Sequence, residues 1–231
     1  MQTEAMDLAA STHCFAKLQQ DLFRERESEA HVATESKRFP NLLIVLGASA
    51  GGLKPIREII GLLPQEFQGV VIVATHRDPK LPSNNLVEIL DRDARIAVRE
   101  PVDGEKLQCT TLYVGKPAES VLIDGRSIHI DEVSSHLERL QRIDELFISA
   151  AKHAGENAVG VILSGTLFDG VAGLQAIHEA GGKCIVQNPR DASYDDMPMN
   201  AIKAVDIDFV GTTTEIASLL VELSAGRTCQ E

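Results

Sequence analysis

The chain has 231 residues, of which 44% are hydrophobic and 24% are charged, with no tryptophan. This length and balance suit one substantial α/β domain, alone or with a short arm. The formal net charge of −12 disfavours nucleic acid and anionic membranes as partners, because phosphate-rich surfaces would repel the protein. No apolar run approaches the ~18 residues that a membrane span requires. The N-terminus also lacks a signal-peptide pattern, so we expect a cytoplasmic protein without direct membrane insertion.

Residues 1–40 differ in character from the rest of the chain. The charged stretch 15–33 places Phe15, Leu18, Leu22 and Phe23 on one face of a predicted helix. One interpretation is a helix that lies on its own domain, which the short apolar stripe favours. The other is a helix used for docking or dimerisation. We therefore predict an N-terminal helical arm or linker at 1–40, followed by a catalytic domain at 41–231.

From Asn41 onward, apolar strands alternate with helices. In chain order, the first half predicts a strand at 42–46, a helix at 52–62, a strand at 70–74 and a helix at 84–90. Residues 96–130 contain short alternating segments separated by Gly104, Pro117 and Gly125, which indicates β-hairpin structure. The second half predicts helices at 137–153, 171–180, 198–205 and 215–223, with strands at 158–163, 184–186 and 207–210.

This alternation predicts a doubly wound α/β fold, with a mostly parallel sheet, helices on both faces and a β-hairpin insertion. Reactive sites of such sheets lie at the carboxyl ends of the strands. The loops that follow Leu46, Ala74 and Leu163 are therefore the places where a site is expected.

The loop after the first strand runs from Gly47 to Gly52. It matches the nucleophile-elbow pattern Gly-x-Ser-x-Gly, with Ser49 at the centre. Small neighbours expose the hydroxyl, and the helix N-terminus supplies N–H groups suited to an oxyanion. A phosphate-binding turn is the alternative, but the glycine spacing of dinucleotide-binding and P-loop motifs is missing. An inert serine in a tight turn is the third interpretation, so the pattern needs a base.

A serine hydroxyl becomes a good nucleophile when a neighbouring group takes its proton. His76 directly follows the second strand, so it meets Ser49 if the two strands are adjacent. Asp169 follows the strand that ends at Leu163 and would orient the imidazole. It also suits the N-cap of the next helix, a role that aspartate fills well. Three strand ends that present Ser, His and Asp form a more specific signal than any one of them.

These residues resemble the catalytic domain of the chemotaxis protein-glutamate methylesterase (CheB) family. The resemblance extends from Leu43 to about Leu223. Its segments are 46–52, Thr75-His76, 102–105, 151–165, Asp169-Gly170, Gln187-Asn188 and Met197-Pro198. Ser49, His76 and Asp169 occupy the positions of the family's catalytic serine, histidine and aspartate.

The resemblance implies a serine hydrolase that cleaves glutamate γ-methyl esters on chemoreceptors and often deamidates glutamines. It needs neither a metal nor another cofactor, and its partner is a methylated chemoreceptor or a related signalling protein. The N–H groups of Ala50 and Thr166 would hold the oxyanion, the second by analogy with the family. Family members usually carry a receiver domain, for which residues 1–40 are too short. We therefore expect a stand-alone catalytic domain.

The sequence departs from the family pattern near the expected substrate. Ala50 replaces the usual threonine, and Thr166-Leu167-Phe168 replaces Met-Gly-Asn before the aspartate. These changes predict an altered substrate or a weakened activity. The rival hypothesis is a non-catalytic interaction module of a sensory complex, which docks through the N-terminal helix and retains the three residues as relics.

The four cysteines, Cys14, Cys109, Cys184 and Cys229, lie far apart and show no metal or redox spacing. We expect them to be reduced, with a disulfide between distant residues as the alternative.

Overall fold

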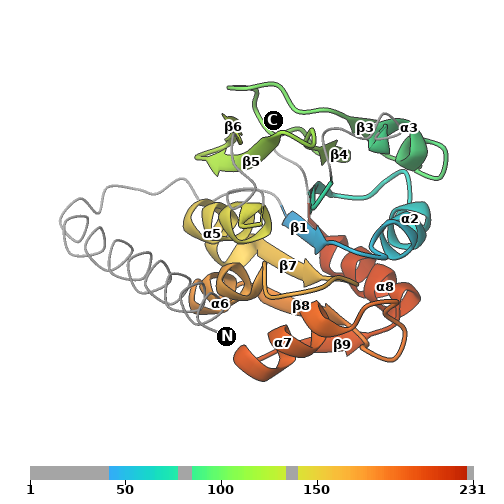
Figure 1. The fold of residues 1–231 in the computed structure, drawn as a ribbon. Helices are drawn as coiled ribbons and strands as arrows, with labels where there is room; N and C mark the ends of the chain where they lie inside the picture. The colour runs from blue at the N-terminus through green and yellow to red at the C-terminus, as the bar shows by residue number, and fades with distance from the viewer. Residues whose placement is uncertain (1–41, 78–84, 134–139, 228–231) are drawn as a thin grey trace. The chain divides into compact units, whose positions relative to one another are not determined.

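The computed structural model describes residues 42–77, 85–133 and 140–227, and its centre is a parallel β-sheet (Figure 1). Across the sheet the strands are β3 (Ala97–Arg99), β4 (Thr111–Val114), β2 (Gly69–Thr75), β1 (Leu42–Ala48), β7 (Ala158–Ile162), β8 (Lys183–Gln187) and β9 (Phe209–Gly211). Every adjacent pair in this sheet is parallel. The expected doubly wound α/β fold is confirmed.

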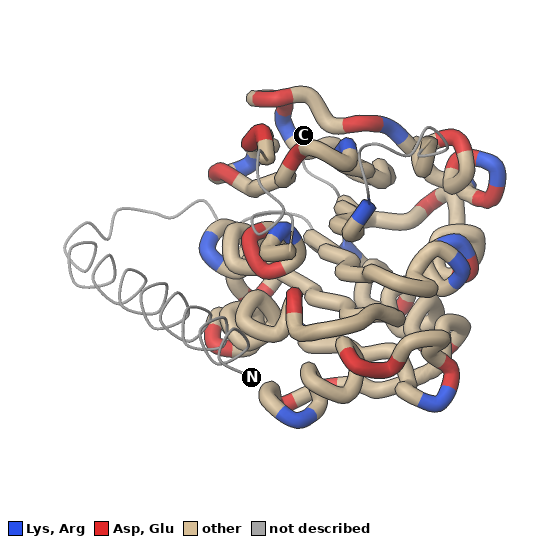
Figure 2. The backbone as a smooth tube through the Cα atoms, viewed as in Figure 1, with Lys and Arg blue, Asp and Glu red and all other residues tan. Residues whose placement is uncertain are grey.

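Helices cover both faces of the sheet. One face packs on α5 (Arg142–Ala154), α6 (Val171–Glu179) and α7 (Asp196–Ala204), and the other on α2 (Leu53–Leu62), α3 (Leu86–Asp91) and α8 (Thr213–Ser224). A one-turn 3-10 helix, η1 (Gly155–Asn157), joins α5 to β7. Charged residues lie on the outer helices and loops, whereas the central strands carry almost none (Figure 2).

The central strand β1 is buried along its whole length, which explains its continuous apolar sequence. Its side chains alternate between the two faces. Leu43 and Val45 pack in the core beneath α5, while Ile44 and Leu46 pack in the core beneath α2. Both faces of this strand therefore contribute to the core.

The segment 96–130 differs in part from the expected hairpin structure. Only β5 (Glu119–Asp124) and β6 (Ser127–Glu132) form an antiparallel hairpin. β3 and β4 instead extend the parallel sheet on the outer side of β2. A strand of three or four residues has too few positions to reveal whether its partner is its sequence neighbour or a distant strand.

β1 lies at the topological switch point of the sheet. The chain proceeds from β1 outward through β2 and β4, and later returns to the other side of β1 as β7. The carboxyl ends of β2, β1 and β7 are therefore neighbours. This edge is where ligands bind in open α/β sheets.

Two sequence predictions fall on residues whose structure is not described. The predicted arm at 1–40 lies outside the described residues, as do Cys14 and Cys229. Cys109 is disulfide-bonded, so the expectation that the cysteines are reduced is wrong for this residue. Cys184 is a free thiol buried in the core.

No helix in the described ranges is long and apolar enough to cross a membrane.

Candidate active site

Ser49 is the first residue after β1 and sits in the turn that leads into α2. Its N–H donates to the carbonyl of Ser164 at 3.0 Å, which ties the turn to the end of β7. Gly51 has a φ of +71°, a conformation that glycine adopts without strain. A Cβ at Gly51 would come within 2.8 Å of both Ser164 Oγ and Ser193 Cβ. The turn therefore requires the last glycine of the Gly-x-Ser-x-Gly pattern.

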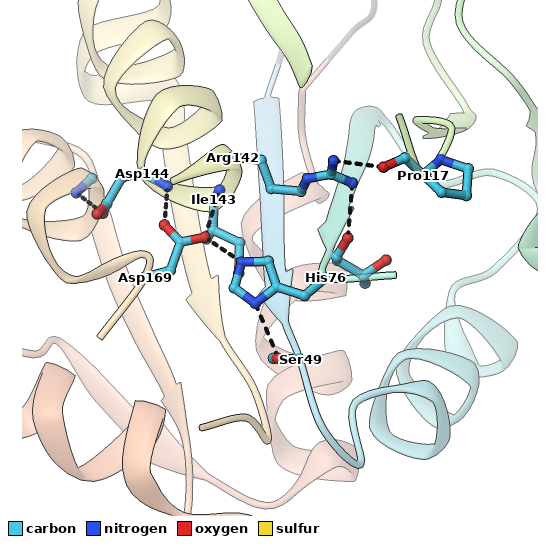
Figure 3. Close-up of polar contacts among 9 residues, drawn as sticks. Ser49, His76, Pro117, Arg142, Ile143, Asp144 and Asp169 are labelled. Carbon is cyan, nitrogen blue, oxygen red and sulfur yellow. Dashed lines mark hydrogen bonds and ion pairs between the residues drawn. The ribbon is translucent and has the colours of Figure 1, made fainter. Parts of the chain in front are cut away.

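His76 lies between Ser49 and Asp169 (Figure 3). Its Nδ1 is 3.1 Å from Ser49 Oγ, and its Nε2 is 2.7 Å from Asp169 Oδ2. An ionised carboxylate only accepts hydrogen bonds, so Nε2 carries the proton and Nδ1 is free to accept one from the serine. In the trypsin-like triad the two ring nitrogens have the opposite partners.

The Asp169 carboxylate is buried and accepts three hydrogen bonds. Besides His76, its donors are the N–H groups of Ile143 at 3.0 Å and Asp144 at 2.9 Å, both in the first turn of α5. The positive end of a helix dipole stabilises an anion at this position. The sequence suggested that Asp169 caps the helix that follows it, and this is wrong: α6 begins without a side-chain cap, and Asp169 caps α5 instead.

A second carboxylate, the partly buried Asp144, stands behind the first. Its Oδ1 accepts the N–H of Gly173 at 2.7 Å, in the first turn of α6. Burial, and then repulsion from Asp169, raise the pKa of Asp144 to about 7. Sequence reasoning did not identify this residue, because an aspartate in the first turn of a helix is common without any function.

Arg142 holds the strand end that carries His76. Its buried guanidinium donates to the carbonyls of Thr75 at 3.2 Å and Pro117 at 2.7 Å (Figure 3). It thereby links the last residue of β2 to the loop between β4 and β5. No sequence motif predicts the bridge made by Arg142, because Arg142 is far from Thr75 and Pro117 in the chain.

Backbone donors lie beside Ser49. Among the described residues, the N–H groups of Ala50 and Thr166 have no hydrogen-bond acceptor. Gly165 lies against the serine, since a Cβ there would be 2.9 Å from Ser49 Cβ. The hydroxyl of Ser164 connects the turn after β1 with the loop between β8 and α7. It donates to the Ala50 carbonyl at 2.9 Å and accepts the Tyr194 N–H at 3.0 Å.

Ser49 opens into a trough of about 1090 Å³ that runs along the exposed face of α2. Its far end is lined by Leu62, Arg92 and Asp93, and its side by Ser193 and Thr214. In the described part of the chain, no group of three or more His, Cys, Asp or Glu side chains could hold a metal ion. The chemistry that this arrangement offers is that of an activated serine beside free N–H donors.

Comparison with known proteins identifies the family. The CheB methylesterase family matches residues 44–220. The chain belongs to this family. CheB relatives of known name include the protein-glutamate methylesterase/protein-glutamine glutaminase of Salmonella typhimurium, which is 34% identical over 191 residues, covering 80% of this chain and 54% of that protein. The enzyme of the same name from Paraburkholderia xenovorans is 36% identical over 182 residues, covering 77% of this chain and 48% of that protein.

Other CheB relatives match over nearly their full length. A Leptospira interrogans protein is 32% identical over 181 residues, which cover 78% of this chain and 93% of that protein. The crystal structure of the Thermotoga maritima CheB methylesterase catalytic domain superposes with a TM-score of 0.72 at 24% identity, covering 79% of this chain and 98% of that one. This structural match establishes the common fold.

Proposed function

We propose that this chain is a carboxylic ester hydrolase that cleaves protein glutamate γ-methyl esters, with Ser49 as nucleophile, His76 as general base and Asp169 as the group that orients the base. The observation that carries the proposal is the continuous hydrogen-bonded series from Ser49 through His76 to Asp169. Membership of the CheB family and the names of its relatives support the substrate class.

The first step is acyl transfer to the serine. His76 Nδ1 takes the proton of Ser49 as Oγ attacks the ester carbonyl. The imidazolium that forms keeps its Nε2–H on Asp169, whose negative charge stabilises it. The N–H groups of Ala50 and Thr166 hold the oxyanion of the tetrahedral intermediate. His76 then returns its proton to the methoxy oxygen, and methanol leaves.

The second step releases the glutamate. Water enters, His76 Nδ1 takes one of its protons, and the resulting hydroxide attacks the acyl carbon. Collapse of the second tetrahedral intermediate returns the proton to Ser49 Oγ and frees the carboxylate. A glutamine side chain follows the same route with ammonia as the leaving group, so deamidation is proposed as a second activity of the same site.

The proposed partner is a methylated chemoreceptor or a related signalling protein, encountered in the cytoplasm. Residues 41–231 are proposed as the catalytic domain, and residues 1–40 as an arm or linker that offers a docking helix. The proposed mechanism uses no residue of this arm.

A serine-directed fluorophosphonate tests the proposed nucleophile. The wild type should be labelled, and Ser49→Ala should abolish labelling. Ser193→Ala is the matched control, because Ser193 is another serine that lines the same trough, and it should be labelled normally. Labelling that survives Ser49→Ala would identify another nucleophile. A folded wild type that is never labelled would instead favour the non-catalytic interaction module.

A further inference from the structure

Exposed apolar side chains belong to the segments that surround the site. Within the described residues, the large exposed hydrophobic side chains are Leu53, Leu62, Val102, Leu167, Phe168, Tyr194, Ile202 and Val210. Four of these, Leu53, Leu167, Phe168 and Tyr194, belong to the three segments that surround Ser49, and we refer to them as the apolar rim. Exposed apolar side chains that cluster mark a binding surface, whereas single ones do not.

The loop between β7 and α6 is built to present two of these side chains. It is bracketed by Gly165, which lies against Ser49, and by Asp169, which contacts His76. Leu167 has a φ of +70°, a strained conformation for leucine. The side-chain amide of Asn200 in α7 donates to the Leu167 carbonyl at 2.8 Å and holds the turn in place. In this turn the side chains of Leu167 and Phe168 are both exposed, Phe168 at 66%.

The two remaining rim residues lie on the other sides of the serine. The Tyr194 ring packs against the elbow, since a Cβ at Gly51 would be 3.1 Å from its Cδ2. Leu53 begins α2 and lines the trough together with Ser49. The segments next to Ser49 therefore carry exposed apolar side chains, in addition to the charged residues of α2 that line the trough.

The trough is larger than a methyl ester requires. Its volume of about 1090 Å³ reaches the upper end of sites that enclose a whole drug-sized molecule, which span roughly 300–1,000 Å³. A glutamyl methyl ester is a single side chain, so the remaining space fits the polypeptide that carries it. The charges along the trough are mostly paired with one another, Arg57 with Asp93 at 2.6 Å and Lys54 with Glu58 at 3.8 Å. The rim is thus the feature that distinguishes one polypeptide from another.

We propose that the apolar rim selects polypeptide substrates in which apolar side chains flank the esterified glutamate. This inference rests on the proposed function of Ser49. It assigns Leu167 and Phe168 a role in specificity, at the positions where the sequence departs from the family pattern. Binding of the flanking side chains places the ester carbonyl at Ser49 Oγ, and such remote contacts contribute to catalysis by positioning.

The test compares two synthetic peptides of equal charge, each with one glutamyl γ-methyl ester, flanked on both sides by leucine in one and by serine in the other. Methanol release gives kcat/KM for each. We expect the wild type to favour the leucine peptide about tenfold, the scale that a small apolar contact provides. Leu167→Asn combined with Phe168→Ser should bring this ratio close to one. Asparagine tolerates the left-handed conformation at position 167, and the ratio cancels any general loss of activity.

Val102→Ser is the matched control, because Val102 is 64% exposed and lies in the loop after the outer strand β3. It should leave the ratio unchanged. A wild-type ratio near one, or a ratio that the double variant retains, would overturn the proposal. Affinity of the two peptides for Ser49→Ala is measured in parallel by fluorescence anisotropy. If no ester is cleaved but the leucine peptide still binds about tenfold more tightly, the rim proposal holds and the proposed catalysis fails; equal affinities overturn the rim.

Discussion

Asp169 and Asp144 cap each other's helices: the Asp169 carboxylate holds the N-terminus of α5, and the Asp144 carboxylate holds the N-terminus of α6. Asp169 lies just before α6 and accepts N–H groups from the first turn of α5, while Asp144 in that turn accepts the Gly173 N–H of α6. The two helices are therefore fixed relative to each other through the carboxylate that orients His76. The cost of this arrangement falls on Asp144, because burial and then repulsion from Asp169 disfavour its ionised form.

This cost predicts a pH-dependent stability. The folded pKa of Asp144, about 7, is above the ordinary 3.8, so folded Asp144 keeps its proton where unfolded Asp144 has lost it. The contribution of this group to stability therefore falls as the pH rises from about 4 to about 7. Asp144→Asn keeps an acceptor for Gly173 but does not titrate. Its stability relative to the wild type should rise across this window and then level off.

Urea unfolding at several pH values measures this difference. Asp144→Ala is the companion variant, because it also does not titrate but leaves the N–H of Gly173 without its acceptor, so it should be about 1–3 kcal/mol less stable than Asp144→Asn at every pH. A stability difference between Asp144→Asn and the wild type that stays constant from pH 4 to 7 would contradict the raised pKa of Asp144.

Asp169→Asn should lower kcat on the order of 10³–10⁴-fold, the scale seen when a triad aspartate is replaced. The neutral amide no longer stabilises the imidazolium, and it permits the tautomer with the proton on Nδ1, which cannot accept the serine proton. Hydrolysis of p-nitrophenyl acetate measures the effect. Asp103→Asn is a matched control, because Asp103 also accepts from a histidine, His129 at 3.0 Å, and from a backbone N–H, but has no serine beside it. Equal losses in both variants would contradict the assigned role.

Gly51→Ala should damage both stability and activity, whereas Gly104→Ala should damage neither severely. Both glycines have left-handed φ angles, +71° and +77°, so both alanines carry a strain of about 1–2 kcal/mol. Only at Gly51 does the added Cβ collide with neighbours, while at Gly104 nothing lies within 4 Å. Displacing the elbow by ~1 Å should cost about 10²-fold in activity. Thermal unfolding and esterase rates measure these effects. If the two variants do not differ in either quantity, the crowding at Gly51 is unimportant.

Arg142→Lys should reduce kcat about tenfold. One ammonium group lacks the fork that reaches both Thr75 and Pro117, so the end of β2 loses a fixed partner and His76 loses its alignment. Arg99→Lys is the comparison, since Arg99 also has two acceptors, Glu105 and Tyr113, but lies at the outer edge of the sheet. A similar loss of kcat in both variants would point to a general effect on stability.

The sequence by itself determined the fold class and the three strand-end residues. Strands buried on both faces, such as β1, have continuous apolar sequences, and short loops after parallel strands must open at the same edge of the sheet. The sequence therefore predicts that Ser49, His76 and Asp169 lie together at one edge of the sheet. The requirement for glycine at position 51 can also be predicted from the sequence, because a sharp turn from a strand into a helix favours glycine locally.

Only the tertiary structure decided how these residues are held. β3 and β4 are so short that their own sequence does not specify their partner, and packing beside β2 made them part of the main sheet. The capping of α5 by Asp169, the position of Asp144 behind it and the Arg142 bridge all join segments that are about 25 to 67 residues apart. Such contacts depend on how the helices pack on the sheet. Hydrophobic periodicity along the chain predicts which face of a helix or strand is buried, but not which residues that face contacts.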